Sequence, residues 1–363
     1  MFSSKKLNAT ALKIDRGLVM QAVITDGKGN VKLQDIPMVK PTEYQCLCKI
    51  NACATCSGTD QKLVRGEFAW ADKYPAILGH ESIGTVIECG AKVENFKVGD
   101  RVLRPAVALP GVMHGELASW MGGFAEYGLV TDMKALKNIS VNIDPFGYSR
   151  YQQIIPADCK ISNADATMLV MLKEVAGACK GAKIAPGHTV LVLGAGAVAR
   201  SMCFFCALAG ARVIVAARRA EPLEHCRRCG ADVAVDLTCD ELESIVMQIT
   251  DNKGVDRVMD AAGNVDLAVR AGNLLADGGG IASYATVDGG AFPVERISPK
   301  GSWLLLESAV PENEMHDEII AMFNAGRLDP SLFYTHKVNF AEFESTFPLL
   351  GAGKAGKIVF EMC

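Results

Sequence analysis

The chain has 363 residues, which is enough for two domains at about 150 residues each. Half of the residues are apolar and 21% are charged, an ordinary globular composition that excludes a disordered chain, a collagen-like repeat and a small disulfide scaffold. The 37 basic and 41 acidic residues give a net charge of −4, so no overall basic field attracts nucleic acid or an anionic membrane surface.

The cysteine pattern indicates a reducing compartment. There are 13 cysteines, an odd number, and several lie in apolar runs such as residues 202–206. A free thiol in such a run behaves as a small hydrophobic side chain, and secreted disulfide frameworks look different. No segment contains about 18 consecutive uncharged apolar residues, the length that a membrane span requires. We therefore expect a cytoplasmic chain without membrane or nucleic-acid partners.

Two kinds of pattern follow each other along the chain. Short β-rich runs separated by Gly, Pro and Asp predict a compact all-β unit, with strands at residues 20–24, 31–33, 46–50, 83–87 and 101–103. Beyond residue 164, apolar strands alternate with amphipathic helices, which predicts a parallel sheet with strands at residues 189–193, 212–216, 256–260 and 280–284. A helix at residues 314–325 and a strand at residues 357–360 end the chain.

Residues 194–199 form a glycine turn between a predicted strand and a predicted helix. Its sequence is Gly194-Ala195-Gly196-Ala197-Val198-Ala199. Glycine allows a tight turn and a close backbone approach to a pyrophosphate, which then lies on helix-terminal N–H groups. Because strand, turn, helix and second strand occur in this order, we predict that the turn binds a dinucleotide through Gly194, Gly196, Ala197 and Val198.

The end of the second strand bears on the choice of cofactor. An Asp or Glu usually stands there in NAD-binding units and binds the ribose hydroxyls. This chain has Ala217 at that position, followed by Arg218 and Arg219. Two guanidinium groups without a carboxylate suit a 2′-phosphate, so NADP is favoured over NAD. The alternative is that both arginines are solvated residues at the start of a helix.

A candidate metal site combines three ligand types. His80 and Glu81 follow an apolar run, Cys56 precedes them, and Glu174 lies later in the chain, in Met171-Leu172-Lys173-Glu174-Val175. A lone histidine in an apolar setting is more often a core residue than a ligand. Thiolate, imidazole and carboxylate together suit zinc, and three protein ligands with one open position suit catalysis.

The motifs, taken in order, resemble the medium-chain dehydrogenase/reductase family. The resemblance covers residues 20–363 and is greatest to the sorbitol and threonine dehydrogenase branch of the zinc alcohol dehydrogenases. It rests on Met20-Gln21-Ala22-Val23, Cys56 with Thr59-Asp60, Gly79-His80-Glu81, Gly99-Asp100-Arg101-Val102, Gly122-Gly123-Phe124-Ala125-Glu126-Tyr127, Glu174, the glycine turn and Gly356-Lys357-Ile358-Val359.

This resemblance implies an α/β fold in which a Rossmann-type doubly wound parallel sheet is inserted into a GroES-like β-rich catalytic domain. The catalytic domain is expected over residues 1–170 and 311–363, and the nucleotide-binding domain over 171–310. Zinc and substrate are expected in the cleft between them, with Cys56, His80, and Glu81 or Glu174 as zinc ligands. Thr59 is expected to relay the substrate proton, and further cofactor contacts are expected at Gly263 and Lys357.

The chain departs from the family pattern at three places. Cys56 stands one residue too far from Thr59-Asp60, and Ser57 occupies the usual cysteine position. Either a one-residue bulge lets Cys56 reach the metal, or Ser57 faces it and zinc binding is weakened. No cysteine occurs between residues 103 and 121, so we expect no structural zinc. Residues 138–153, with Phe146, Tyr148 and Tyr151, form a longer connection that is expected as a cleft wall, a subunit contact or an exposed loop.

A competing pattern has the spacing of a zinc ribbon, with Cys203 and Cys206 followed by Cys226 and Cys229. Its pairs fall on predicted helices instead of tight turns, which opposes a ribbon-type binding module. Cys53 and Cys56 have the spacing of a redox pair, a minor alternative.

The expected activity is reversible oxidation of a secondary alcohol to a ketone, with hydride transfer to NAD(P). By analogy with the polyol branch, Glu174 favours a polyol, cyclitol or amino-polyol substrate. The alternative within the fold is a zinc-independent NADPH-dependent enone or quinone reductase. A homodimer or homotetramer is expected.

Overall fold

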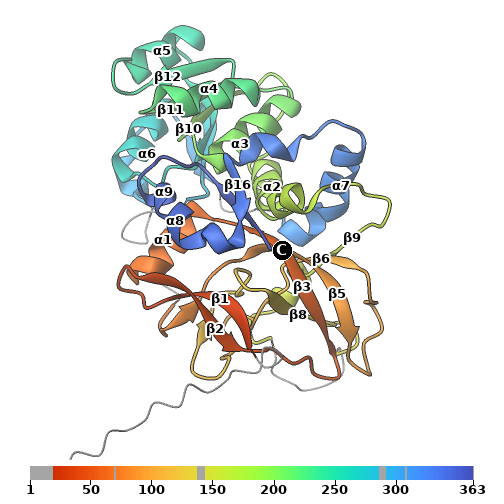
Figure 1. The fold of residues 1–363 in the computed structure, drawn as a ribbon. Helices are drawn as coiled ribbons and strands as arrows, with labels where there is room; N and C mark the ends of the chain where they lie inside the picture. Colours follow the sequence, from red (N-terminus) through yellow and green to blue (C-terminus); the bar gives the residue numbers. More distant parts are fainter. Residues whose placement is uncertain (1–18, 69–70, 137–143, 286–291, 307–308, 363) are drawn as a thin grey trace, which may run out of the picture.

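A computed structural model describes residues 19–68, 71–136, 144–285, 292–306 and 309–362. Their strands form three sheets, which divide the described chain into a β-rich lobe and a nucleotide-type α/β lobe (Figure 1). The last strand returns to the β-rich lobe, so the α/β lobe is inserted within it.

The β-rich lobe contains two sheets, one in the order β2-β1-β4-β7 and one in the order β16-β17-β3-β5-β6-β9, with β8 also paired to β3. Three phenylalanines, Phe124, Phe343 and Phe360, pack together in a core of this lobe. Its elements up to β9 are β1 (Val19–Thr25), β2 (Val31–Pro37), β3 (Gln45–Ala54), α1 (Ser57–Arg65), β4 (Ala76–Ile77), β5 (Glu81–Cys89), β6 (Arg101–Leu103), β7 (Ala118–Ser119), β8 (Tyr127–Thr131), η1 (Tyr148–Tyr151) and β9 (Ile154–Ile155).

The α/β lobe is a six-stranded parallel sheet in the order β12-β11-β10-β13-β14-β15. This is the doubly wound strand order of dinucleotide-binding folds, with its switch point between β10 and β13. Its elements are β10 (Thr189–Leu193), α3 (Ala197–Leu208), β11 (Arg212–Ala217), α4 (Ala220–Arg228), β12 (Val233–Asp236), α5 (Leu242–Ile249), β13 (Val255–Asp260), α6 (Val265–Gly272), β14 (Leu275–Ser283), η2 (Val294–Arg296) and β15 (Trp303–Leu305).

Alternating side chains of β10 explain why helices cover both faces of this sheet. Val190 and Val192 are buried in one core cluster with helices α2 and α3, and Leu191 and Leu193 are buried in another with α5 and α6. A strand that is apolar on both faces has to be covered on both, as the sequence pattern predicts.

The two lobes are joined by α2 (Asn163–Gly181) and by the C-terminal segment. Ser162 caps α2 by accepting the Asp165 N–H at 3.1 Å. The predicted boundary between residues 170 and 171 falls inside this helix. The remaining elements are η3 (Glu312–Met315), α7 (His316–Asn324), η4 (Pro330–Phe333), β16 (His336–Asn339), η5 (Phe340–Glu342), α8 (Phe343–Thr346), α9 (Pro348–Gly351) and β17 (Ile358–Glu361).

The fold bears on three further expectations. Cys203 and Cys206 lie on α3 and Cys226 lies on α4, so these thiols stand on helices instead of ribbon knuckles. The predicted connection at residues 138–153 is described only from residue 144 onward, and residues 138–143 lie outside the described residues. None of the helices in the described parts of the chain is long and apolar enough to cross a membrane.

Candidate active site

A cavity of about 660 Å³ lies between the two lobes. The β-rich lobe lines it with Cys56, Thr59, His80 and Glu81, and the α/β lobe lines it with the first turn of α3 and with residues 261–263. Ligands of doubly wound folds bind at the carboxyl ends of the strands, where this cavity opens. The cavity is therefore the candidate active site.

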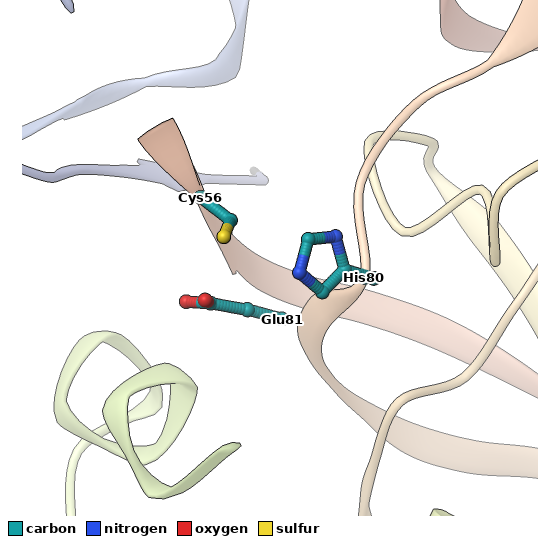
Figure 2. Close-up of side chains that lie close together, drawn as sticks. All are labelled: Cys56, His80 and Glu81. Atoms are coloured by element: carbon teal, nitrogen blue, oxygen red, sulfur yellow. The ribbon is translucent and has the colours of Figure 1, made fainter. Parts of the chain in front are cut away.

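Strand pairing brings the candidate metal ligands together. β3 and β5 are antiparallel, and Ala54 at the end of β3 is paired with Glu81 at the start of β5. Cys56 follows two residues after Ala54, so its thiol lies beside His80 and Glu81. Figure 2 shows these three side chains converging on the same space, one from the end of β3 and two from the start of β5.

The backbone conformation of Gly79 sets the position of His80, the next residue. The Gly79 φ of +97° lies in the left-handed region that favours glycine. A Cβ atom at this position would lie 2.4 Å from the backbone nitrogen of Phe124, which no side chain could tolerate. The close approach to Phe124 therefore requires glycine immediately before His80.

The donor atoms of Cys56, His80 and Glu81 fit a shared zinc ion. One ligand atom from each residue lies within 4.8 Å of the other two, and these are sulfur, imidazole nitrogen and carboxylate oxygen. Zinc binds such donors at about 2.0–2.3 Å, which requires ligand atoms a few ångströms apart. Within the described residues this is the one group of three such ligands.

Two buried side chains, those of Asp60 and Lys357, contact the candidate metal ligands. The Asp60 carboxylate accepts the Cys56 N–H at 2.8 Å, and its other oxygen lies 3.8 Å from His80 Nδ1. Lys357 Nζ lies 2.5 Å from Glu81 Oε2, with both side chains less than 5% exposed. Such partners fix the orientation of metal ligands. Lys357 contacts Glu81 and also lines the cavity that the glycine turn shares, so its expected contact with the cofactor stays a prediction.

The charges around the group favour a cation. Burial raises the pKa of the Cys56 thiol, and the nearby Glu81 carboxylate raises it further. Burial also raises the pKa of Asp60 to about 7, against the opposing effect of His80. Two carboxylates and one thiol thus lie close to a single lysine, which leaves an excess of acidic groups. A divalent ion stabilises the ionised thiolate and carboxylate.

Glu174 lines the same cavity but is not part of the group of three. Arg104 Nη2 lies 2.7 Å from its Oε1, and the Tyr284 hydroxyl donates to its Oε2 at 2.7 Å. Burial opposes ionisation, yet Arg104 and the hydrogen bonds lower the pKa of Glu174 to about 2. Arg104 and Tyr284 therefore hold the Glu174 carboxylate in this structure, and its expected role as a metal ligand stays a prediction.

The extra residue after Cys56 lies at the start of α1. Cys56 is the N-cap residue, and its thiol lies 3.6 Å from the Thr59 hydroxyl. The Ser57 hydroxyl donates instead to the Gly356 carbonyl at 3.3 Å. The structure thus places the thiol, and not the serine, beside His80, and Thr59 lines the cavity next to it.

The glycine turn has the geometry of a phosphate-binding loop. Gly194 has a φ of +100°, and Gly196 is the N-cap residue of α3. A Cβ atom on Gly196 would meet no atom within 4 Å, so this side of the turn is open to a ligand. The N–H groups of Ala197 and Val198 begin the helix there, where a helix N-terminus attracts phosphate.

A second cavity, of about 750 Å³, extends from the glycine turn to the end of β11. Arg218, Arg219 and Gly263 line it, and Arg219 also donates to the Gly353 carbonyl at 2.8 Å. Both arginines are exposed at the end of the strand, where a phosphate placed beyond it would meet their guanidinium groups. The glycine turn, Gly263 and the two arginines thus line these two adjoining cavities, and Lys357 lines the first of them with Gly196, Ala197, Val198 and Gly263.

Sequence reasoning missed Arg104 and Tyr284. Arg104 stands in no motif, and its φ of +56° is unusual for a side chain other than glycine. Its N–H donates to Ser82 and its carbonyl accepts from Gln152, which holds this conformation. A cation within the apolar run 102–109 was the available signal. Tyr284 follows directly after β14, a position that the parallel-sheet prediction could have flagged.

Comparison with known proteins agrees with this geometry. Residues 42–140 match the family model of the alcohol dehydrogenase GroES-like domain, and residues 197–324 match that of zinc-binding dehydrogenases. The chain is 27% identical to the NADP-dependent isopropanol dehydrogenase of Thermoanaerobacter brockii over 85% of this chain and 90% of that one. It is 28% identical to D-arabinitol dehydrogenase 1 of Uromyces fabae over 71% and 72%.

A solved structure shares the whole fold. The 2R,3R-butanediol dehydrogenase of Bacillus subtilis superposes with a TM-score of 0.76 at 20% identity, covering 94% of this chain and 99% of that one. The two matched domains, the doubly wound sheet and the Cys56, His80 and Glu81 group agree with one another. The chain belongs to the medium-chain dehydrogenase/reductase family, among its zinc-binding alcohol dehydrogenases, and is an oxidoreductase.

Proposed function

We propose that the protein is a zinc-dependent dehydrogenase that interconverts a secondary alcohol and a ketone with NADP. The observation that carries this proposal is the convergence of Cys56, His80 and Glu81 in a cavity that the glycine turn also lines. When bound, zinc supplies a Lewis acid that polarises the substrate oxygen. When bound, the nicotinamide supplies the hydride acceptor.

Metal binding, ligand orientation and proton transfer are assigned to different side chains of the cavity. Cys56, His80 and Glu81 hold the metal, while Asp60 and Lys357 fix their orientation. The Thr59 hydroxyl, next to the Cys56 thiol, takes the proton of the substrate hydroxyl and passes it outward.

The finer substrate class follows from Glu174. Its side chain is 35% exposed into the cavity and ionised, so it offers acceptors to additional hydroxyl or amino groups of a substrate. We therefore propose a polyol, cyclitol or amino-polyol. The name of the arabinitol dehydrogenase among the relatives supports this class, and the name of the isopropanol dehydrogenase supports NADP.

A subunit contact is proposed at the edge strand β15. This strand ends the parallel sheet, and Leu304 on it is 61% exposed. Because unpaired edge strands with exposed apolar residues favour association, we propose a homodimer or homotetramer. Light scattering of the purified protein tests this, and a monomer at micromolar concentration would contradict it.

Turnover with and without the thiol tests the proposed function. NADPH formation is measured with sorbitol, arabinitol, myo-inositol and 2,3-butanediol, for the wild type, Cys56→Ser and the control Cys239→Ser. Cys239 is exposed on the α/β lobe, so its replacement should leave activity unchanged. We expect Cys56→Ser to abolish turnover. Activity that survives this substitution would favour the zinc-independent reductase of the same fold.

A further inference from the structure

A separate cavity lies beside the candidate active site. It has a volume of about 660 Å³, within the range of small-molecule sites. Three segments line it, at residues 71–73, 110–120 and 146–151. The second lies where the family carries its structural-zinc lobe, and the third belongs to the longer connection that the sequence shows. None of the three segments contains a residue of the metal group or of the glycine turn.

The two cavities share part of their walls. Trp120 and Tyr148 line both the outer cavity and the candidate active site, so the two spaces meet at these rings. The Trp120 ring packs edge-on against Phe68, with centroids 4.9 Å apart, and Phe68 also lines the active site. The outer cavity is therefore adjacent to the active site, and a substrate that occupied both would pass Trp120 and Tyr148.

The walls of the outer cavity are built from ordered backbone. The Asp144 carboxylate accepts the N–H groups of Tyr148 and Ser149, each at 2.8 Å, and so caps η1. The Trp120 N–H donates to the Ile77 carbonyl at 3.1 Å. Both shared rings thus stand on backbone that is fixed by hydrogen bonds, which is what a preformed subsite requires.

The lining favours an apolar ring. Phe146 is 62% exposed and Met113 is 41% exposed, although both are large apolar side chains. Both line the cavity, where a ligand would cover them. The Arg150 guanidinium is already hydrogen-bonded to the Tyr151 hydroxyl at 2.7 Å and lies over that ring, so it extends the aromatic wall. Aromatic walls of this kind bind flat or apolar groups most strongly.

We propose that this outer cavity binds an apolar, aryl-sized group at the far end of the substrate, while the hydroxyl or keto group lies at Cys56, His80 and Glu81. The inference rests on the proposed function and extends it. The substrate then carries its hydroxyl or amino groups at the reacting end, where Glu174 lies, and an apolar ring at the far end, and Phe146, Trp120 and Tyr148 determine the specificity for that ring.

Two ketones that share a reacting end test the subsite. NADPH-dependent reduction of 2-butanone and of 4-phenyl-2-butanone is measured for the wild type, Phe146→Ala, Met113→Ala and the control Leu208→Ala. Leu208 is likewise apolar and 42% exposed, but it lies on α3 outside the cavity. Calorimetric binding of both ketones is measured in parallel, because it reports the subsite even when no turnover occurs.

We expect kcat/KM for the phenyl ketone to exceed that for 2-butanone by about tenfold or more, as burial of a ring implies. Phe146→Ala should lower the phenyl preference several-fold through KM, and Leu208→Ala should not. Equal binding of the two ketones, or a phenyl preference unchanged in Phe146→Ala and Met113→Ala, would overturn the subsite. Phenyl-selective binding without turnover of any substrate would instead retain the subsite and contradict the proposed function.

Discussion

The buried guanidinium of Arg104 gives a quantitative prediction. Its Nη2 lies 2.7 Å from Glu174 Oε1 and 2.7 Å from Glu312 Oε2, and the side chains of Arg104 and Glu312 are each 5% exposed. Burial raises the pKa of Glu312 to about 7; Arg104 and the buried Lys173 oppose this shift, and the neighbouring Glu174 adds to it.

The sign of the pH dependence follows from this raised pKa. Between its ordinary pKa of 4.5 and about 7, Glu312 keeps a proton in the native chain and loses it in the unfolded chain. Stability is therefore greatest below this range and falls as the pH rises through it. At about 1.4 kcal/mol per pKa unit, Glu312 alone removes about 3 kcal/mol by pH 8.

Arg104→Met removes the charge and keeps an unbranched side chain. Removing one partner of a buried ion pair costs about 3–5 kcal/mol, so we expect the free energy of unfolding to fall by this amount near pH 8. The loss should be smaller near pH 5.5, because Glu312 is then protonated and needs no cation. Urea unfolding followed by circular dichroism measures both values.

The double variant Arg104→Met/Glu312→Gln is the control for this experiment. It lacks one of the unpaired carboxylates, so it should regain part of the stability that Arg104→Met loses near pH 8. An equal loss at both pH values, or a loss below about 1 kcal/mol near pH 8, would show that the pair behaves as an exposed one and would refute the reasoning.

Three further predictions follow from the glycines and the arginines. Gly196→Ala should leave stability unchanged, because its Cβ meets no atom within 4 Å, but should raise the KM for NADPH; an unchanged KM would contradict a phosphate site there. Gly79→Ala should lower the melting temperature markedly, since its Cβ would lie 2.4 Å from the Phe124 nitrogen; a melting temperature equal to that of the wild type would show that this contact relaxes. Arg218→Ala should raise the KM for NADPH about tenfold and leave the KM for NADH unchanged, because one charged phosphate contact is lost. The control Arg212→Ala, at the other end of β11, should change neither KM. Equal changes for both cofactors would show that Arg218 is only a surface charge.

The parts of the fold that were predictable depend on local pattern. The run 189–193 is apolar at every position except the first, and only a strand covered on both faces buries such a run. The turn at residues 194–199 then follows from glycine geometry. The grouping of Cys56 with His80 and Glu81 was expected from motif order, and the Ala54–Glu81 register supplies the physical reason for it.

The remaining parts depend on contacts between distant segments. Arg104 reaches Glu312 across 208 positions of the chain, and Tyr284 reaches Glu174 across 110, so no local pattern could reveal either contact. The choice between Cys56 and Ser57 depended on where α1 begins, which the sequence left open. The longer connection bearing Tyr148 had three possible roles, and only its contact with the active site distinguishes a cleft wall from the others.

Zinc content per chain tests the central claim most directly. Metal analysis of the purified protein is compared for the wild type, Cys56→Ser and Ser57→Ala, the last being a matched change at the adjacent position, whose hydroxyl contacts Gly356. The account predicts about one zinc ion per chain in the wild type and in Ser57→Ala, and almost none in Cys56→Ser. Zinc that is retained in Cys56→Ser, or lost only in Ser57→Ala, would contradict it.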